Sequence, residues 1–140
     1  MRATLLLADS ATQDNTGKIH ALGIGWSVTS TPPPPSALIV LFRVPWHGSD
    51  QPHTFALSLV DADGRPVTVQ QDGQLRPIGI EGQFEVSRPQ GLPAGTDLDQ
   101  NLCIPVGGGW NLAPGSSYEW RLDVDGRHEA DWVAPFTVRA

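Results

Sequence analysis

Histidine and aspartate are the residue types in this chain best suited to binding a metal ion or moving a proton. The four histidines are spread along the sequence, at His20, His47, His53 and His128. None is paired with another at the close spacing that metal-binding motifs use. His47 and His53, with Asp50 between them, could converge only if the intervening loop folds back. We therefore expect solvated loop histidines and no metal site.

An acidic stretch, Asp61-x-Asp63-Gly64, is similar to the start of a calcium-binding loop. The remaining ligands and the closing glutamate of such a loop are absent at the required spacing. Asp and Gly are also the residues that a tight hairpin turn needs. The pattern therefore predicts a turn, not a calcium site.

Motifs for nucleophilic catalysis and for nucleotide binding are also missing. The chain has no G-x-S-x-G elbow, no Walker sequence and no evident pair of catalytic carboxylates. Gly23 and Gly25 form a G-x-G pair that lacks the third glycine and the following helix of a dinucleotide loop. Cys103, the only cysteine, lies in the apolar stretch LCIPV, where it is expected to pack as a small buried apolar residue. These observations predict a non-enzymatic protein without a cofactor.

Five tryptophans in 140 residues are the least ordinary feature of the composition. Trp26, Trp120 and Trp132 fall on the apolar faces of predicted strands and are expected in the core. Trp46 ends an apolar strand, and Trp110 follows a run of glycines. Exposed tryptophan is enriched at binding surfaces. Trp46 and Trp110 are therefore the candidate interface, provided that both are exposed at the same end of the molecule.

The charge of the chain restricts its partners. The formal net charge is −6, Lys18 is the only lysine, and no cluster of Lys and Arg is present. This argues against binding to nucleic acid or to an anionic membrane surface. The apolar run at residues 3–8 is too short for the core of a signal peptide, and no stretch reaches the length of a membrane span. We expect a cytoplasmic protein.

The elements that position these residues are predicted to be β-strands. With 15 Gly and 13 Pro, the chain is punctuated by turns and poor in good helix formers. Residues 53–70, HTFALSLVDADGRPVTVQ, alternate apolar and polar positions on both sides of Asp63-Gly64, which predicts the two strands of a hairpin. The length indicates a single domain over residues 1–140.

The same period of two predicts the other strands. Residues 3–8 and 36–46 are expected to be buried strands, and 18–28 a strand with Leu22, Ile24, Trp26 and Val28 on one face. Prolines 32–35 predict a stiff extended linker. Strands are also expected over 78–86, 102–106, 118–124 and 132–138. Asp-Gly turns are expected at 72–73 and 125–126, and a long loop over 87–99.

Two segments carry a resemblance to known families. Leu112-x-Pro114-Gly115-x-x-Tyr118 resembles the corner before a late strand in fibronectin type III and other immunoglobulin-like domains. In that corner a tyrosine hydroxyl hydrogen-bonds to the backbone a few residues upstream. The chain lacks the paired cysteines of antibody domains.

The first half of the chain resembles an uncharacterised bacterial domain family, and the similarity covers roughly the whole chain. The residues that carry this resemblance are LLLADSA at 5–11, then Gly17-Lys18-Ile19, then Gly23. The similarity continues through the proline segment and the Asp63-Gly64 turn. That family has no established activity, so the resemblance supports a fold and implies no chemistry.

We therefore expect an all-β chain folded as an antiparallel immunoglobulin-like β-sandwich of eight or nine strands. The leading hypothesis is a binding or assembly module that contacts protein, including a second copy of itself, through loops or an open sheet edge. The alternative is a small-ligand or carbohydrate-binding sandwich in which Trp46 and Trp110 are stacking platforms. A third hypothesis is an enzyme whose residues converge only in the fold.

Overall fold

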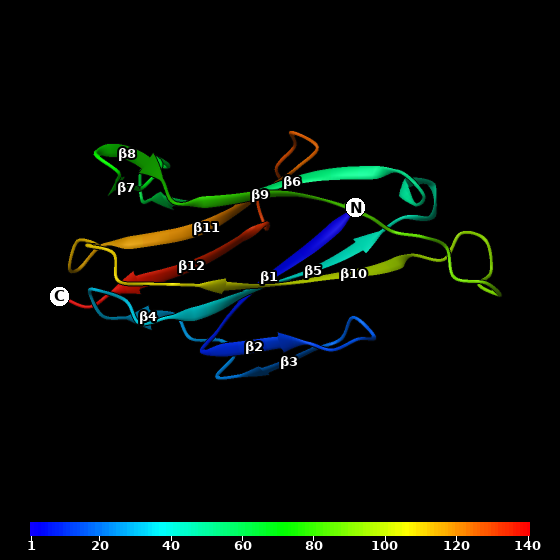
Figure 1. Ribbon diagram of the computed structural model, residues 1–140, viewed down its shortest axis with the longest axis horizontal. Coiled ribbons are helices and arrows are strands. Elements are labelled where there is room, and N and C mark those ends of the chain that lie inside the picture. Colours follow the sequence, from blue (N-terminus) through cyan, green and yellow to red (C-terminus); the bar gives the residue numbers. More distant parts are fainter.

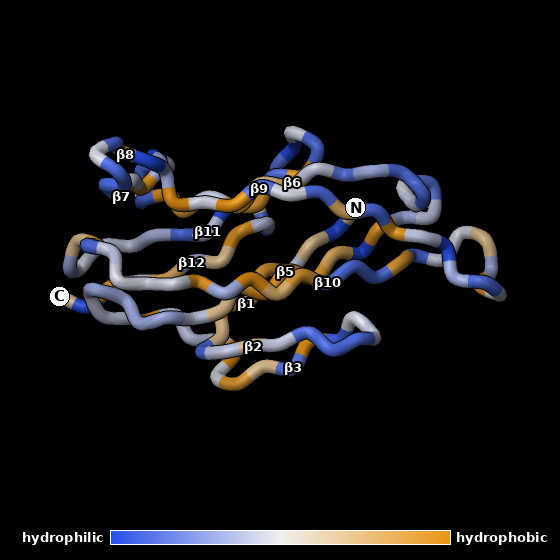
Figure 2. The backbone as a smooth tube through the Cα atoms, viewed as in Figure 1, coloured by the Kyte–Doolittle hydropathy of each residue, from blue (hydrophilic) through white to orange (hydrophobic).

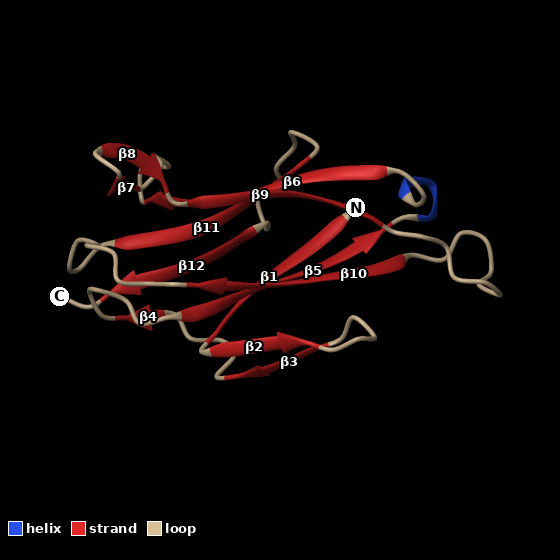
Figure 3. Ribbon diagram, viewed as in Figure 1, coloured by secondary structure: helices blue, strands red, loops and turns tan.

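Two β-sheets, packed face to face, form the body of the molecule (Figure 1). The computed structural model describes residues 1–140. The strands are β1 (Arg2–Ala8), β2 (Ser10–Gln13), β3 (Ile19–Leu22), β4 (Val28–Thr29), β5 (Ser36–Val44), β6 (Pro52–Asp61), β7 (Thr68–Gln71), β8 (Gln74–Pro77), β9 (Gly79–Glu85), β10 (Leu98–Val106), β11 (Ser117–Val124) and β12 (Val133–Val138). The one helical segment is the 3-10 turn η1 (Trp46–Gly48), at one end of the sandwich (Figure 3). No helix of the chain is long and apolar enough to cross a membrane.

The smaller sheet has the order β1-β5-β10, with both pairs antiparallel. Its central strand β5 is the most apolar segment of the chain, as the sequence predicts. Leu38, Val40, Phe42 and Val44 point from β5 into the core between the sheets, and all are almost completely buried. Figure 2 shows the apolar positions gathered where β1, β5 and β10 cross the centre of the molecule. This burial is the main stabilising contribution of the sheet.

The larger sheet has the order β4-β12-β11-β6-β9. All its pairs are antiparallel except the short β4–β12 pair, which is parallel. Alternate residues of β11 face the core, as predicted, and Tyr118, Trp120, Leu122 and Val124 are buried there. The hydroxyl of Tyr118 accepts a hydrogen bond of 2.8 Å from the backbone N–H of Ala113. The corner predicted from this segment therefore forms.

The expected number of strands is too low. The chain forms twelve strands in four sheets. The two facing sheets hold eight of them, and the rest form two small hairpins, β2–β3 and β7–β8, outside the facing sheets (Figure 1). The short strands β2 and β8 have mostly polar, exposed side chains and carry little periodic signal, so sequence patterns miss them.

The hairpin predicted within residues 53–70 forms only next to its turn. Asp63-Gly64 does form a turn, in which a carboxylate oxygen of Asp61 accepts hydrogen bonds from the N–H groups of Asp63 and Arg65. However, β6 pairs with β9 and β11, whereas β7 pairs with β8. Only an isolated bridge between Val60 and Pro66 joins the two arms. Local alternation predicts strands, but the partner of a strand depends on distant residues.

The strand predicted over residues 18–28 is also wrong in its second half. Strand β3 ends at Leu22, and Leu22, Ile24 and Val28 are 73%, 55% and 49% exposed. Gly23 and Gly25 have φ values of +67° and +94°, which only glycine adopts readily. These conformations break the period of two, so the segment crosses between the sheets as a loop.

Strand β10 differs from its prediction in where it begins and in the burial of Cys103. The strand predicted over 102–106 begins already at Leu98, which shortens the long loop that precedes it. Cys103, expected to be buried, is only half-buried in β10. It lies opposite Ile39 of β5 on the face that points away from the shared core. Burial nevertheless raises the pKa of the Cys103 thiol, which makes the nucleophilic thiolate rarer at neutral pH.

Candidate functional site

The two long sides of the sandwich are closed to different extents. On one side, the segment after β3 passes between β1 and β12, where the N–H of Gly25 donates to the carbonyl of Leu7. Trp26 packs edge-on against Phe136 there, with 5.6 Å between ring centroids. On the other side, β9 and β10 end their sheets without a further strand. The side between β9 and β10 is therefore the open one.

An apolar crevice of about 230 Å³ lies at this open side. Its walls include Ile80 of β9 and Ile104 of β10, and its deeper lining includes Leu38 and Trp120 from the core. Ile80 is 43% exposed although it points toward the inside of the sandwich. None of the ten lining residues is charged. The crevice can therefore accept an apolar side chain without desolvating a charge.

Trp110 stands at the mouth of this crevice and is held there firmly. Its ring packs edge-on against Trp120, with centroids 6.3 Å apart. The loop before it is fixed because the N–H of Gly109 donates to the carbonyl of Pro33 over 2.9 Å. At Gly108, φ is +75° and a Cβ atom would lie 2.6 Å from the same carbonyl oxygen. The proline linker thus serves as the base on which Trp110 is positioned.

The structure does not bring Trp46 and Trp110 together. Trp46 follows the last residue of β5, whereas Trp110 follows the last residue of the antiparallel β10. The two rings therefore lie at opposite ends of a nine-residue strand pair, about 30 Å long. Both side chains are half-buried. The condition for a joint interface is not met, and only Trp110 lies at the open side.

Trp46 belongs instead to a polar network at the η1 end. The guanidinium of Arg88 stacks over the Trp46 ring, 4.4 Å from its centroid. Arg88 also donates to the hydroxyl of Ser49 over 2.6 Å and to the carbonyl of Trp46 over 3.0 Å. An aromatic face covered by a cation in this way is not free to stack on a ligand.

A second hollow, about 770 Å³ in volume, lies on another side of Trp110. It runs between the β7–β8 hairpin and residues 109–111. Its lining combines the Trp110 ring with the amide side chains of Gln70, Gln71 and Asn111, and none of its twelve lining residues is charged. We call it the neutral groove. It offers an aromatic surface and neutral hydrogen-bonding groups side by side.

His53, expected to be a solvated loop residue, is buried in β6. Its Nδ1 lies 2.7 Å from Oδ2 of Asp125, and its Nε2 lies 2.6 Å from the carbonyl oxygen of Gly48. Burial alone would lower the pKa of His53, but these two hydrogen bonds outweigh it and raise the pKa above 6.5. Burial likewise opposes the lowering of the Asp125 pKa, which hydrogen bonds from His53 and Thr54 produce. Both ring nitrogens are occupied by acceptors, so the imidazole joins β6 to η1 and to the turn after β11, and it is not available as a base for a substrate.

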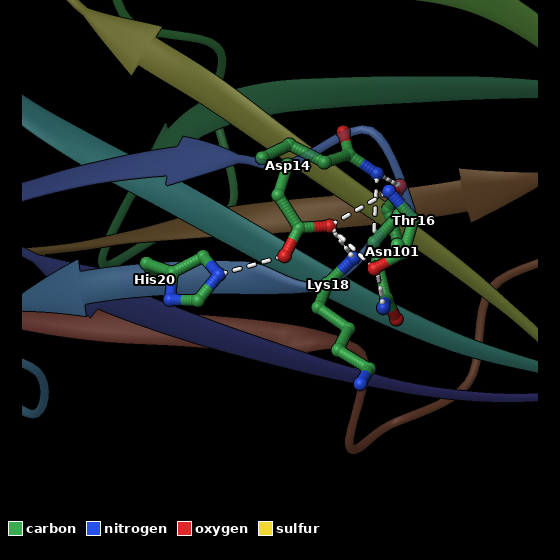
Figure 4. Close-up of polar contacts among 7 residues, drawn as sticks. Asp14, Thr16, Lys18, His20 and Asn101 are labelled. Atoms are coloured by element: carbon green, nitrogen blue, oxygen red, sulfur yellow. Dashed lines mark hydrogen bonds and ion pairs between the residues drawn. The ribbon is translucent and has the colours of Figure 1, made fainter.

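The tip of the β2–β3 hairpin is organised by Asp14 (Figure 4). Its Oδ1 accepts hydrogen bonds from the hydroxyl and N–H of Thr16 and from the N–H of Lys18, and its Oδ2 lies 2.8 Å from Nε2 of His20. These contacts, first of all those with Thr16 and His20, lower the pKa of Asp14. Asn101 of β10 donates to the carbonyl of Gly17 over 2.9 Å. The hairpin is thus tied to β10, next to the free edge of that strand.

The other histidines take no part in the open side. His47 is exposed in η1, and its carbonyl accepts from the side chain of Gln51. His128 Nδ1 lies 2.7 Å from the carbonyl oxygen of Leu122. Trp120 and Trp132 are buried in the core as predicted, while Trp26 is half-buried at the closed side.

Sequence patterns missed Ile80 and Ile104 as site residues. Both occupy apolar positions of an ordinary alternating strand, which predicts core packing. They line a crevice only because β9 and β10 both lie at sheet edges on the same side. An inward-facing residue is exposed when its strand lies at the edge of a sheet. The alternation of apolar and polar residues does not show which strands lie at an edge.

Comparison with known families identifies the family of the chain. Residues 3–139 match the model of a family described as a family of unknown function (DUF6941), so the chain belongs to that family. No curated protein matches the chain.

Proposed function

We propose that this member of the DUF6941 family is a non-enzymatic protein-binding module that holds an extended segment of a partner protein at its open side. The observation that carries the proposal is the apolar crevice between the two edge strands β9 and β10, with Trp110 at its mouth. The main chain of an extended peptide can hydrogen-bond to the free edge of a sheet, and its apolar side chains can fill the crevice. Complete burial of one Leu or Val side chain there contributes about 1.5–3 kcal/mol.

A partner protein suits this site better than a second copy of the chain. Each copy has a net charge of −6, so two copies repel one another at low ionic strength. Glu81 and Glu85 are exposed on β9, and a two-fold contact between β9 strands would bring the glutamates of the two copies close together. Self-association remains a distinct outcome of the test below.

The proposal is tested by selecting peptides from a random displayed library on the wild-type protein. We expect the selection to yield extended peptides. Their affinity should be at least roughly tenfold lower for Ile80→Glu than for the wild type, because the glutamate places a charge in the crevice. Leu22→Glu is the control, since Leu22 is also an exposed apolar residue but does not line the crevice. Hydrogen exchange with bound peptide should show protection in β9 or β10.

Selected peptides that bind Ile80→Glu as well as they bind the wild type would refute the proposal. Selection of no peptide, together with a concentration-dependent dimer that Ile80→Glu abolishes, would assign the open side to self-association instead.

The neutral groove supports a second candidate, the binding of an uncharged carbohydrate. Sugar rings stack on tryptophan and hydrogen-bond to amide side chains, and the groove presents Trp110 beside Gln70, Gln71 and Asn111 without any charge. A glycan array followed by titration of tryptophan fluorescence tests this. Binding that Asn111→Ala weakens and Ile80→Glu leaves intact would favour it, and a flat array and titration would exclude it.

Other expectations from the sequence remain proposals. The corner formed by Tyr118 and Ala113 supports an immunoglobulin-like sandwich, as does the Pro114-Gly115 turn before it. The lone thiol of Cys103 suits a reducing compartment and thus a cytoplasmic location. The bacterial origin implied by the N-terminal resemblance is likewise a prediction.

A further inference from the structure

The free edges of β9 and β10 differ in how well they are protected against the addition of a further strand. Pro105 lies within β10, opposite Ala37 of β5. A proline in an edge strand turns its nitrogen, which carries no hydrogen, away from the paired strand. The free edge of β10 therefore lacks a donor at this position. The carbonyl of Asn101 is also already occupied, since it accepts a hydrogen bond of 3.0 Å from the side chain of Gln13. Both features hinder the addition of a strand to β10.

Strand β9 has no such protection. The N–H of Leu59 donates to the carbonyl of Ile78 over 3.0 Å, and hydrogen-bonded pairs recur at every second residue of antiparallel strands. The main-chain groups of the alternate positions therefore point away from β6, and these positions are Gly79, Glu81, Gln83 and Glu85. No proline interrupts β9. The outward N–H and C=O groups of these four residues therefore form a continuous free edge, to which a further strand can hydrogen-bond.

The side chains of β9 present a different chemistry on each face. Ile80, Gly82 and Phe84 point inward, where Ile80 reaches the crevice. Glu81, Gln83 and Glu85 point outward and are exposed. Neither glutamate belongs to any of the seven ion pairs of the chain. A strand added to β9 would thus meet apolar neighbours on one face and unpaired carboxylates on the other.

We propose that β9 accepts an added strand whose residues alternate between apolar and basic side chains. This inference rests on the proposed function and names the partner's chemistry. The apolar residues of the added strand lie over the crevice beside Ile80. Its Lys or Arg residues lie next to Glu81 and Glu85, where opposite charges on neighbouring strands attract. Its main chain completes the hydrogen bonds that β9 leaves open.

A second copy of β9 does not have this chemistry. A two-fold antiparallel pair centred on Gln83 would place Glu81 of each copy opposite Glu85 of the other. Like charges directly opposite one another destabilise a strand pair. The free edge of β9 thus discriminates against self-association while remaining open to a basic segment.

The test uses two fluorescein-labelled peptides of nine residues, one alternating Val and Lys and the other alternating Val and Glu. Their binding to the full chain is measured by fluorescence anisotropy. We expect the Val-Lys peptide to bind roughly tenfold more tightly at low salt. The double variant Glu81→Lys, Glu85→Lys should reverse that preference. Gln83→Pro removes an outward N–H and should weaken binding roughly tenfold, whereas Gln83→Ala, which keeps the N–H, should change binding less than about twofold.

Equal affinity for the two peptides, no binding of either, or an unchanged preference in the charge-reversed variant would overturn the inference. The charge reversal lies on exposed positions, so it remains informative even if Gln83→Pro does not fold. If library peptides depend on Ile80 while the Val-Lys peptide does not bind, the inference fails and the proposed function stands. If no library peptide depends on Ile80, the proposed function itself fails.

Discussion

His53 and Asp125, 72 residues apart in the chain, are joined by a contact of 2.7 Å between Nδ1 and Oδ2. The second ring nitrogen of His53 reaches the carbonyl of Gly48, and Oδ1 of Asp125 accepts from the N–H of Thr54. The imidazole thus links η1 and β6 to the turn after β11. This linkage makes the stability of the η1 end depend on pH.

The stabilisation by His53 should decline at alkaline pH. Its folded-state pKa is raised above 6.5, so its contribution is complete below pH 6.5 and is lost as the pH rises through the folded-state pKa. For Asp125, whose pKa is lowered below 3.8, the contribution is present above 3.8 and is lost as the pH falls through the folded value. The difference in melting temperature between wild type and His53→Gln, measured between pH 5 and 9, should shrink toward pH 9. A difference that is constant over this range would contradict the linkage.

Tyr118→Phe should lower the free energy of unfolding by about 1–2 kcal/mol, because the N–H of Ala113 loses its acceptor. Urea denaturation gives the value directly. Ser117→Ala on the same strand is the control, since its hydroxyl is exposed, and it should change stability by less than about 0.5 kcal/mol. Equal effects of the two substitutions would show that the corner hydrogen bond contributes nothing specific.

Gly108→Ala should be more damaging than Gly109→Ala. Both glycines have positive φ, at +75° and +80°, but only at Gly108 does an added Cβ meet backbone atoms, those of Pro33 and Pro34. Gly109→Ala should lower the free energy of unfolding by about 1 kcal/mol, because alanine is strained at positive φ. Gly108→Ala should lower it by roughly 1–3 kcal/mol more, because the added Cβ also displaces the loop. Chemical denaturation measures both. Because Trp110 stands on this loop, Gly108→Ala should also shift the tryptophan emission spectrum, and an unchanged spectrum would argue against that coupling.

Asp14→Ala should loosen the β2–β3 hairpin without unfolding the sandwich. Its carboxylate accepts from the N–H groups of Thr16 and Lys18, so these amides should exchange with deuterium faster in the variant. Thr12→Ala, at an exposed position of β2, is the control and should leave their exchange unchanged. If the exchange of Thr16 and Lys18 is as slow in Asp14→Ala as in the wild type, Asp14 does not hold the turn.

The chemistry of β9 could be read from the sequence in part. The alternation of Ile80 and Phe84 with Glu81 and Glu85 indicates a strand with one apolar and one acidic face, and the structure confirms it. Nothing local distinguishes this strand from β11, which alternates in the same way but has a partner on both sides. Nor could the sequence tell whether Trp46 and Trp110 lie at the same end, because their separation depends on the antiparallel pairing of β5 with β10.

The sequence by itself determined the long strands, the Asp-Gly turns and the Tyr118 corner, because each depends on residues within a few positions of one another. Period-two alternation and the conformational needs of turns are local properties. Only the tertiary structure decided which edge stays free, that Ile80 and Ile104 line one crevice, and that His53 contacts Asp125. These relationships join residues far apart in the chain, and sheet order selects them through burial of the whole core rather than through any local pattern.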